Sequence, residues 1–340
     1  MEEWILNFFS GVSSSLLTTL PLIPASIGFY IALRSVRFPD LTVEGSFVFG
    51  GVISAIFIQE GYSPYIAIIF SILGGMFCGY LTALWHTKLK IPQFVSGIIT
   101  TFIFTSVNYG LLKIVAKTDG VVESLSLFNK GIFEWANNYD NNLKSFLGEL
   151  RYAELIFLII IISIVVIIVF LIIKSRTGLR MRAFGSHRIA GNIYDKQYYT
   201  ATFFGLAFAN ALVALSGTFV TQFNSSIDVK MGSTLLIPLL AAVVFGEFIV
   251  EFIYTKKIKR KEITRPLLSR PLGLAIAPFI GFLIFNFIVL LFGAIILPMV
   301  KTEQNFLDTY HKYWIIALFI LFVLAIRKTD RKNEMSDELI

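Results

Sequence analysis

Two carboxylates lie four residues apart near the start of the chain, Asp40 and Glu44 in the sequence RFPDLTVEGSFVFGG. If this stretch is helical, the spacing places both side chains on one face. Acidic side chains beside an apolar segment are costly and usually face protein or water. With the hydroxyls of Thr42 and Ser46, they predict a polar kink beside a path for a solute. An equally supported interpretation is an ordinary helix start, with Asp40 as the N-cap and Glu44 near the positive helix end.

Uncharged polar side chains recur inside two other apolar segments. Asn108 ends the stretch SGIITTFIFTSVN, in which Ser and Thr residues lie at helical spacing. Asn210, Ser216 and Gln222 lie within GLAFANALVALSGTFVTQF. Small and hydroxylated residues commonly pack helices against one another in a membrane. The functional alternative is a mildly polar lining, which suits a neutral or zwitterionic small solute better than a bare ion.

A basic segment punctuated by glycine follows one of the apolar runs, at 174–198. Gly178, Arg180, Arg182 and Gly185 alternate there with apolar side chains, which predicts an amphipathic helix of one or two turns that ends at a glycine. Such a helix, lying across the membrane surface, can seat its apolar residues in the groove of a partner. The simpler alternative is a cluster of cations that anchors the chain at the surface.

Motifs for nucleotide hydrolysis and for metal or nucleophilic catalysis are missing from the sequence. It has no GxxxxGK[ST] phosphate loop and no HExxH, and its three histidines, His86, His187 and His311, lie at the ends of apolar segments. No basic face alternates with aromatic residues outside the apolar runs, which argues against a nucleic-acid partner. We therefore expect a conduit rather than an enzyme, with no metal site.

The apolar segments that must position these residues are long enough to cross a bilayer. The run from Leu155 to Ile173 has no charge over nineteen positions, close to the roughly 20 helical residues that a hydrocarbon core requires. Hydrophobic residues make up 56% of the 340 and charged residues 15%, against about 45–50% and about 25% in soluble domains. The sequence predicts an all-α integral membrane protein with about nine transmembrane helices. They are expected at 12–33, 43–59, 64–85, 91–116, 154–173, 199–221, 232–252, 272–300 and 313–326.

The charges between these segments predict the orientation of the chain. Five connectors hold 21 of the 29 Lys and Arg residues, at 34–42, 86–90, 174–198, 253–271 and 327–340. Nine spans place all five on one face, so the positive-inside rule puts the N-terminus outside and the C-terminus inside. The loop 174–198 is then cytoplasmic, and 117–153 is the main extracytoplasmic segment. The segment 43–59 is short and rich in glycine, so it is expected either to span or to be partly re-entrant.

Four stretches between residues 37 and 247 occur in the order found in a known family. They are RFPDLTVEGSFVFGG, VSGIITTFIFTSVNYGLLKIVAKTDG, TGLRMRAFGSHRIAGNIYD and GLAFANALVALSGTFVTQFNSSIDVKMGSTLLIPLLAAVVFGE. In these stretches the chain resembles the permease subunits of bacterial ABC importers of the branched-chain amino-acid/ribose type. Within that type it is most similar to the tryptophan/tyrosine-type subgroup. With no linker or internal repeat in the sequence, residues 1–340 are expected to form a single transmembrane permease domain in the bacterial plasma membrane.

The resemblance implies partners and a division of labour. A second permease copy, most simply an identical one, a cytoplasmic ABC ATPase dimer and an extracytoplasmic solute-binding protein are expected. ATP and Mg²⁺ would be used by the ATPase, and no cofactor is expected on this chain. The loop 174–198 would contact the ATPase, and the implied coupling residues are Gly178, Arg180, Arg182 and Gly185.

The expected function is ATP-driven import of a small polar solute, most simply an amino acid. The candidate path residues are Asp40, Thr42, Glu44, Ser46, Asn108, Asn210, Ser216 and Gln222. The alternative is a standalone secondary transporter of a small metabolite, which would need a charged site near the midplane and often has inverted repeats.

Overall fold

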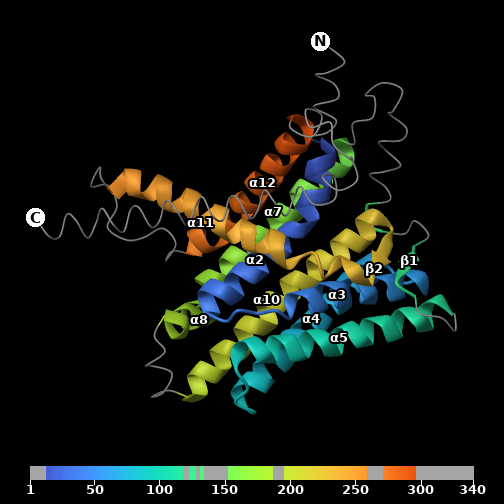
Figure 1. Cartoon of the computed structure of the whole chain (residues 1–340), viewed down its shortest axis with the longest axis horizontal. Coiled ribbons are helices and arrows are strands. Elements are labelled where there is room, and N and C mark those ends of the chain that lie inside the picture. Colours follow the sequence, from blue (N-terminus) through green and yellow to red (C-terminus); the bar gives the residue numbers. More distant parts are fainter. Residues whose placement is uncertain are drawn as a thin grey trace, which may run out of the picture.

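A computed structural model describes residues 13–117, 122–127, 131–133, 152–186, 195–258 and 271–295 of the chain, which are almost entirely helical (Figure 1). The first apolar helix, Ser13–Val36, changes its winding along its length. It passes through the 3-10 turn η1 (Leu20–Leu22) and the α-helix α2 (Ile23–Tyr30) into the π-helical η2 (Ile31–Val36). Pro21 and Pro24 lie in the first turns of η1 and α2, where a missing N–H is tolerated.

Eight of the nine predicted apolar segments coincide with helices. The helices after α2 are α3 (Val43–Gln59), α4 (Pro64–Thr87), α5 (Gln93–Ala116), α7 (Tyr152–Lys174), α8 (Arg176–Ser186), α10 (Asp195–Asn224), α11 (Leu236–Ile258) and α12 (Pro271–Ile295). Within the described residues, six helical stretches are long and apolar enough to cross a membrane, and two shorter ones lie at Val43–Gln59 and Ile276–Val289. The ninth predicted segment, 313–326, lies outside the described residues.

Helix α10 forms the centre of the bundle and packs against α2, α3 and α4. Glycines on the neighbouring helices allow this close approach. A Cβ atom added to Gly50 of α3 would overlap the backbone carbonyl of Ala214, and one added to Gly79 of α4 would overlap that of Leu206. Small residues at such contacts let helix backbones approach closely, and so favour dispersion contacts between membrane helices.

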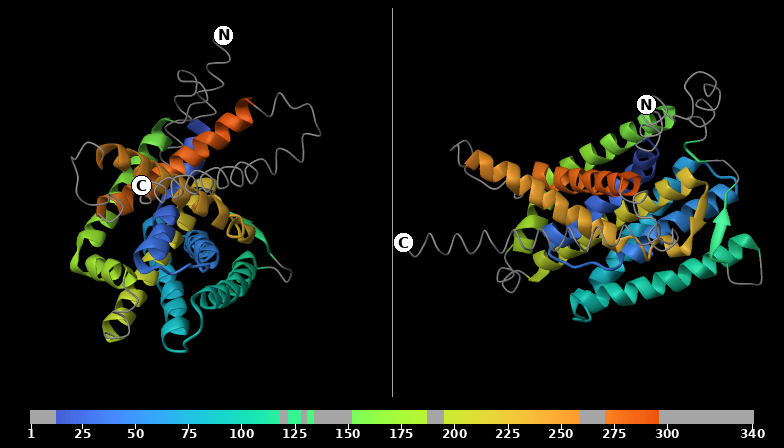
Figure 2. Two further views of the ribbon diagram at one scale, coloured as in Figure 1. Left: turned by 60° about the vertical axis from the view of Figure 1, so that its left-hand side comes forward. Right: turned by 45° about the horizontal axis from the view of Figure 1, so that its top comes forward.

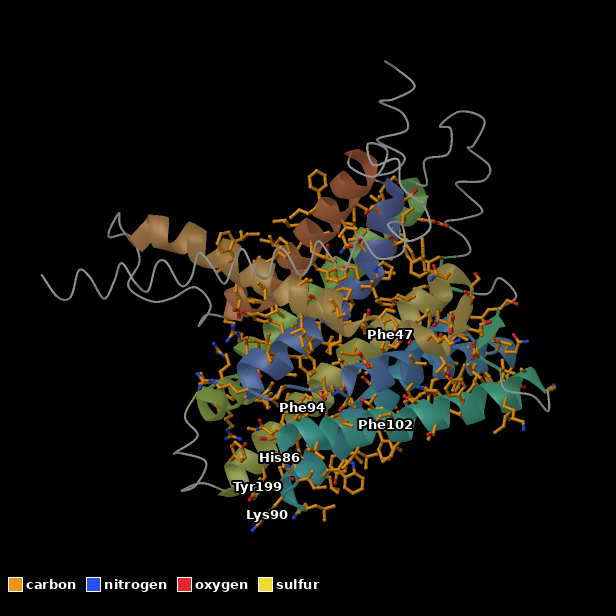
Figure 3. The ribbon with its side chains drawn as sticks, in the orientation of Figure 1. Phe47, His86, Lys90, Phe94, Phe102 and Tyr199 are labelled. Atoms are coloured by element: carbon orange, nitrogen blue, oxygen red, sulfur yellow. The ribbon has the colours of Figure 1, made fainter. Side chains whose placement is uncertain are left out.

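The helices at the periphery expose large apolar side chains. Phe102 of α5 is 69% exposed and Ile114 is 72% exposed, whereas Phe47 of α3 is only 2% exposed (Figure 3). Two further views show α5 along the edge of the bundle (Figure 2). Large apolar side chains are also exposed on α4 and α7. These outer surfaces suit contact with lipid or with another apolar subunit.

A two-stranded antiparallel sheet joins the segment after α5 to the segment after α10. In it β1 (Ser124–Ser126) pairs with β2 (Ser226–Asp228), and Leu125 lies opposite Ile227. This pairing is an addition to the predicted all-α fold. The strands lie at one end of the bundle, while α8 and the start of α10 lie toward the other end (Figure 1). His86, Lys90 and Tyr199 lie toward that second end (Figure 3).

Candidate functional site

The connector before α3 is partly buried, and its buried residues include a carboxylate. Arg37 ends η2 in the left-handed conformation, and the chain then turns inward through Phe38 and Asp40, which are both 0% exposed. The N-cap of α3 is Thr42, two residues beyond the Asp40 of the helix-start interpretation. The backbone N–H of Thr42 donates to Asp40 Oδ1 at 2.8 Å. The helix therefore begins among buried side chains.

Asp40 belongs to a buried network of hydrogen bonds with α3 and α10. Asn210 Nδ2 donates to Asp40 Oδ2 at 2.6 Å, and Ser46 Oγ donates to Asn210 Oδ1 at 2.7 Å. Asp40, Ser46 and Asn210 are all 0% exposed. Both carboxylate oxygens of Asp40 and both polar atoms of the Asn210 amide have partners within this network, which ties the start of α3 to the middle of α10.

Thr42 extends the polar contacts toward α4 and α5. Its hydroxyl lies 2.7 Å from the hydroxyl of Thr82, which in turn donates to Thr100 at 3.0 Å. All three residues are buried. The structure thus brings four of the predicted path residues together: Asp40, Ser46 and Asn210 are joined by side-chain hydrogen bonds, and the backbone of Thr42 bonds to Asp40.

Two other predicted path residues lie apart from this network. Ser216 Oγ donates to the carbonyl of Pro21 at 2.6 Å, and so connects α10 to the first helix. Gln222 Nε2 donates to Ser54 Oγ at 3.0 Å, and its Oε1 accepts from the backbone N–H of Ile132 at 3.2 Å. Ser216 is 0% exposed and Gln222 is 2% exposed.

The last two predicted path residues, Glu44 and Asn108, line a cavity of about 130 Å³. Glu44 lies in the first turn of α3 and is half-buried, while Asn108 of α5 is completely buried. Asn108 Nδ2 donates to the carbonyl of Gly45 at 3.3 Å, but its Oδ1 has no hydrogen-bond partner among the residues that the structure describes. The remaining lining residues are Val48, Thr101, Thr105, Tyr109, Val229, Lys230, Gly232 and Ser233.

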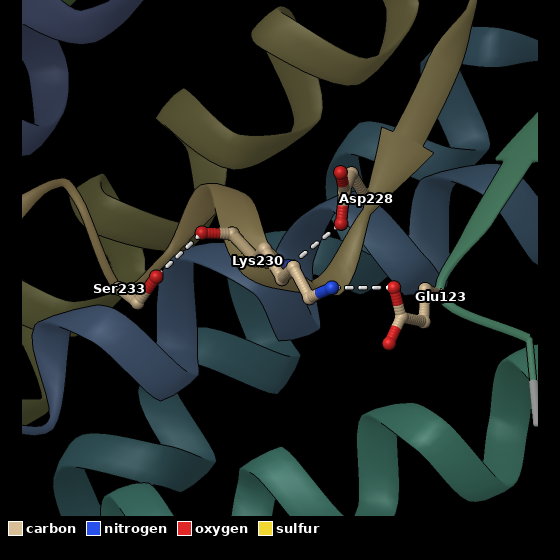
Figure 4. Close-up of polar contacts among 4 residues, drawn as sticks. All are labelled: Glu123, Asp228, Lys230 and Ser233. Atoms are coloured by element: carbon tan, nitrogen blue, oxygen red, sulfur yellow. Dashed lines mark hydrogen bonds and ion pairs between the residues drawn. The ribbon is translucent and has the colours of Figure 1, made fainter. Parts of the chain in front are cut away.

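A lysine that was not predicted lies at the rim of this cavity. Lys230 belongs to η3 (Val229–Met231), the 3-10 turn that follows β2, and its Nζ pairs with Glu123 at 2.5 Å (Figure 4). Asp228 Oδ1 accepts from the backbone N–H of Lys230 at 2.8 Å, and Ser233 Oγ donates to the Lys230 carbonyl at 2.8 Å. One feature of the sequence sets it apart, because it is the only Lys or Arg between Lys196 and Lys256.

The predicted amphipathic helix in the basic loop is α8, which is longer than expected. It runs over eleven residues, from Arg176 to Ser186, so Gly185 lies inside the helix and does not end it. Ser175 separates it from α7 and accepts a weak bond from the N–H of Gly178 at 3.4 Å. A Cβ atom on Gly178 would overlap the carbonyl of Ile173, so this residue allows the sharp turn between the two helices.

The two sides of α8 differ in their environment. Met181 is 3% exposed, and its methyl group lies near Gly205 of α10, close to Val36 of η2. Arg180 is exposed. Arg182 is partly buried, and this desolvation lowers the pKa of its guanidinium from the usual value. Helix α8 is therefore held against η2 and α10 on one side and presents Arg180 to solvent.

Comparison with known proteins identifies relatives over most of the chain. The family model described as the permease component of a branched-chain amino acid transport system matches residues 11–326. A tyrosine transport system permease protein from Clostridioides difficile (strain R20291) is 27% identical over 237 residues, covering 70% of this chain and 73% of the relative. An uncharacterized protein, RP368, from Rickettsia prowazekii (strain Madrid E) is 28% identical over 232 residues, covering 67% of this chain and 74% of that protein. No solved structure matches the chain.

Proposed function

Because the chain belongs to the family of branched-chain amino acid transport permease components, we propose that it forms the membrane path of an ATP-driven importer. As a permease component it is a transport subunit and not an enzyme, and its apolar helices place it in a membrane. The proposed cargo is a small polar solute, most simply an amino acid. The observation that carries the proposal is the family match over residues 11–326, and the cavity lined by polar and charged groups among apolar helices agrees with it.

The proposed topology has about nine spans in a single domain over residues 1–340, with the N-terminus outside and the C-terminus in the bacterial cytoplasm. The described helices support it, because the α4–α5 connector, α8 and the end of α11 lie toward one end of the bundle (Figure 1). The β1–β2 pair lies toward the opposite end. Connectors rich in Lys and Arg are retained on the cytoplasmic side.

The proposed partners are a second permease copy, a cytoplasmic ATPase dimer that uses ATP and Mg²⁺, and an extracytoplasmic solute-binding protein. An ATPase and a binding protein accompany ABC permeases of this family in general. We propose that α8 receives the movement of the ATPase, with Gly178, Arg180, Arg182 and Gly185 as coupling residues. The burial of Met181 supports this role, because a push on α8 would reach η2 and α10 through it.

The residues proposed for the path divide into two groups by their contacts. Glu44 and Asn108 line the cavity, and so are placed to contact a solute directly. Asp40, Thr42, Ser46, Asn210, Ser216 and Gln222 bond to other helices, so their contribution to the path would be to position its walls. The name of the Clostridioides difficile relative makes L-tyrosine the first solute to test.

Reconstitution into proteoliposomes tests the proposed function. The chain is reconstituted with the proposed ATPase and solute-binding protein, and uptake of radiolabelled L-tyrosine and other amino acids is measured. We expect uptake that requires ATP, the ATPase and the binding protein. Uptake by the chain alone, driven by an ion gradient, would instead indicate a secondary transporter.

Reversing the exposed charge on α8 tests the coupling residues. We expect Arg180→Glu to lower solute-stimulated ATPase activity by about tenfold or more, because a reversed charge at an interface opposes docking. Insertion should be normal, since Arg180 is exposed. Lys113→Glu reverses an exposed cation on α5 and serves as the matched control. Equal stimulation in both variants would remove Arg180 from the coupling role.

A further inference from the structure

The cavity between α3, α5 and η3 carries groups of both charges, and we propose that it is the site where the charged head group of the solute binds. Glu44 and Asn108 would accept hydrogen bonds from an ammonium group. Lys230 would exchange its partner Glu123 for the carboxylate of the solute. The assignment rests on the proposed function and adds to it a ligand of defined chemistry, a zwitterion with adjacent ammonium and carboxylate groups, and a role for each residue.

The unpartnered oxygen of Asn108 is the first observation that points to a ligand. The side chain is 0% exposed, and its amide nitrogen is already used by the carbonyl of Gly45. Among the described residues its Oδ1 has no hydrogen-bond partner, and Asn108 is one of the residues that line the cavity. An unsatisfied buried acceptor costs about 1–3 kcal/mol. A ligand that brings a donor to this oxygen would recover that free energy, whereas a ligand without donors would not.

Glu44 provides a second acceptor at the same cavity. It comes from α3 while Asn108 comes from α5, so the two acceptors approach the cavity from different helices. Within the part of the chain that the structure describes, no cation forms an ion pair with Glu44. An ammonium group has three donors and a positive charge, and so matches a carboxylate together with an amide oxygen.

Lys230 supplies the opposite charge at the rim. Its present partner, Glu123, is held beside it by the backbone bond from Val229 N–H to the Glu123 carbonyl at 2.9 Å. The side chains of Lys230 and Glu123 are 62% and 52% exposed, and water and salt weaken such an exposed pair. A solute carboxylate can therefore displace Glu123 at little cost in free energy. The present pairing with Glu123 also shows that Lys230 is placed to bind a carboxylate.

The size of the cavity fits a head group better than a whole solute. A cavity of about 150 Å³ binds benzene, which has six non-hydrogen atoms, and this cavity of about 130 Å³ is slightly smaller. The five non-hydrogen atoms of an α-amino acid head group occupy a similar space. The side chain of the solute would then extend out of the cavity, so this site would recognise the two charges, while contacts elsewhere would select among side chains.

Binding to the purified full chain tests the two-charge site. The melting temperature in detergent is measured with each common L-amino acid, and the one that raises it most is titrated for its Kd. Its decarboxylated amine and its deaminated acid should each bind at least about tenfold more weakly, since each lacks one charged hydrogen-bonding group. If no amino acid raises the melting temperature, or if either analogue binds as tightly as the parent, the proposal is wrong.

Variants of Glu44, Lys230 and Glu123 then test the role proposed for each of these residues. Glu44→Gln and Lys230→Gln should each raise the Kd by about tenfold or more. Glu60→Gln, at the exposed end of the same helix α3, and Lys113→Gln on α5 are the matched controls and should leave it unchanged. Glu123→Gln should lower the Kd, by up to about fivefold, because it removes the group that competes for Lys230. Weaker binding in Glu123→Gln would contradict the exchange of partners.

Uptake measurements separate failure of this site from failure of the proposed function. If ATP-dependent amino-acid uptake occurs but its KM is unchanged in Glu44→Gln and Lys230→Gln, the chain is an importer whose solute binds elsewhere. If no ATP-dependent uptake of any amino acid occurs in the complete assembly, the proposed function itself is wrong.

Discussion

Asp40 and Glu44 are only four residues apart in sequence, but they belong to two regions that differ in how far their polar groups are hydrogen-bonded. Asp40, Ser46 and Asn210 have no exposure and satisfy one another. At the cavity, Glu44 is half-buried and Asn108 Oδ1 has no hydrogen-bond partner in the described part of the chain. A satisfied network fixes the positions of helices, whereas an unsatisfied group retains hydrogen-bonding capacity for a ligand. Polar residues of one membrane bundle can therefore be sorted by their partners into those that hold the structure and those available to a solute.

Removing each carboxylate in turn should separate the two regions most clearly. Asp40→Ala leaves the Thr42 N–H and an Asn210 N–H without their acceptor, at about 1–3 kcal/mol each. We expect a loss of about 2–6 kcal/mol of stability from these two groups, and hence a large fall in the melting temperature of the purified chain. Glu44→Ala is the matched change at the cavity and should leave the melting temperature nearly unchanged. A similar fall in melting temperature in both variants would mean that both carboxylates stabilise the fold.

The spacing of these carboxylates shows where prediction from sequence succeeded and where it could not. The bounds of α3 follow from its composition, and the predicted segment 43–59 matches the helix. The expectation that Asp40 and Glu44 share a face depended on a helix through both residues. The helix begins at Val43, so Asp40 lies in the preceding connector and its carboxylate points to a different set of partners.

Lys230 was missed for a different physical reason. Its position at the cavity depends on a turn that follows β2, and β2 pairs with a strand about a hundred residues earlier in the chain. Strands of three residues leave almost no periodic pattern in a sequence, so neither the pairing nor its consequence could be predicted. The basic amphipathic helix α8, in contrast, was predicted from local pattern alone, although it is longer than predicted and does not end at Gly185.

Two glycines allow a second comparison, between the packed centre of the bundle and α5, and the expected changes in stability are smaller. Gly50→Ala places a methyl group against the Ala214 backbone, and we expect overpacking to cost about 1–3 kcal/mol. No described residue lies where a Cβ of Gly110 on α5 would be placed, so Gly110→Ala should stabilise the chain by up to about 1 kcal/mol through its helix propensity. Thermal unfolding of the two variants in detergent measures whether each substitution stabilises or destabilises the chain. A stabilising Gly50→Ala would show that α3 and α10 are not in close contact.

The smallest effect on stability is expected at the rim of the cavity. Lys230 and Glu123 form an ion pair 2.5 Å long, but more than half of each side chain is exposed. The pair is therefore screened by water and salt, and holding two flexible side chains together opposes its attraction. Lys230→Gln should leave the melting temperature unchanged at both low and high salt, although the same substitution is expected to weaken solute binding. A clear fall in melting temperature, larger at low salt, would instead make this ion pair part of the structural framework, and would place Lys230 with the buried network and not with the cavity.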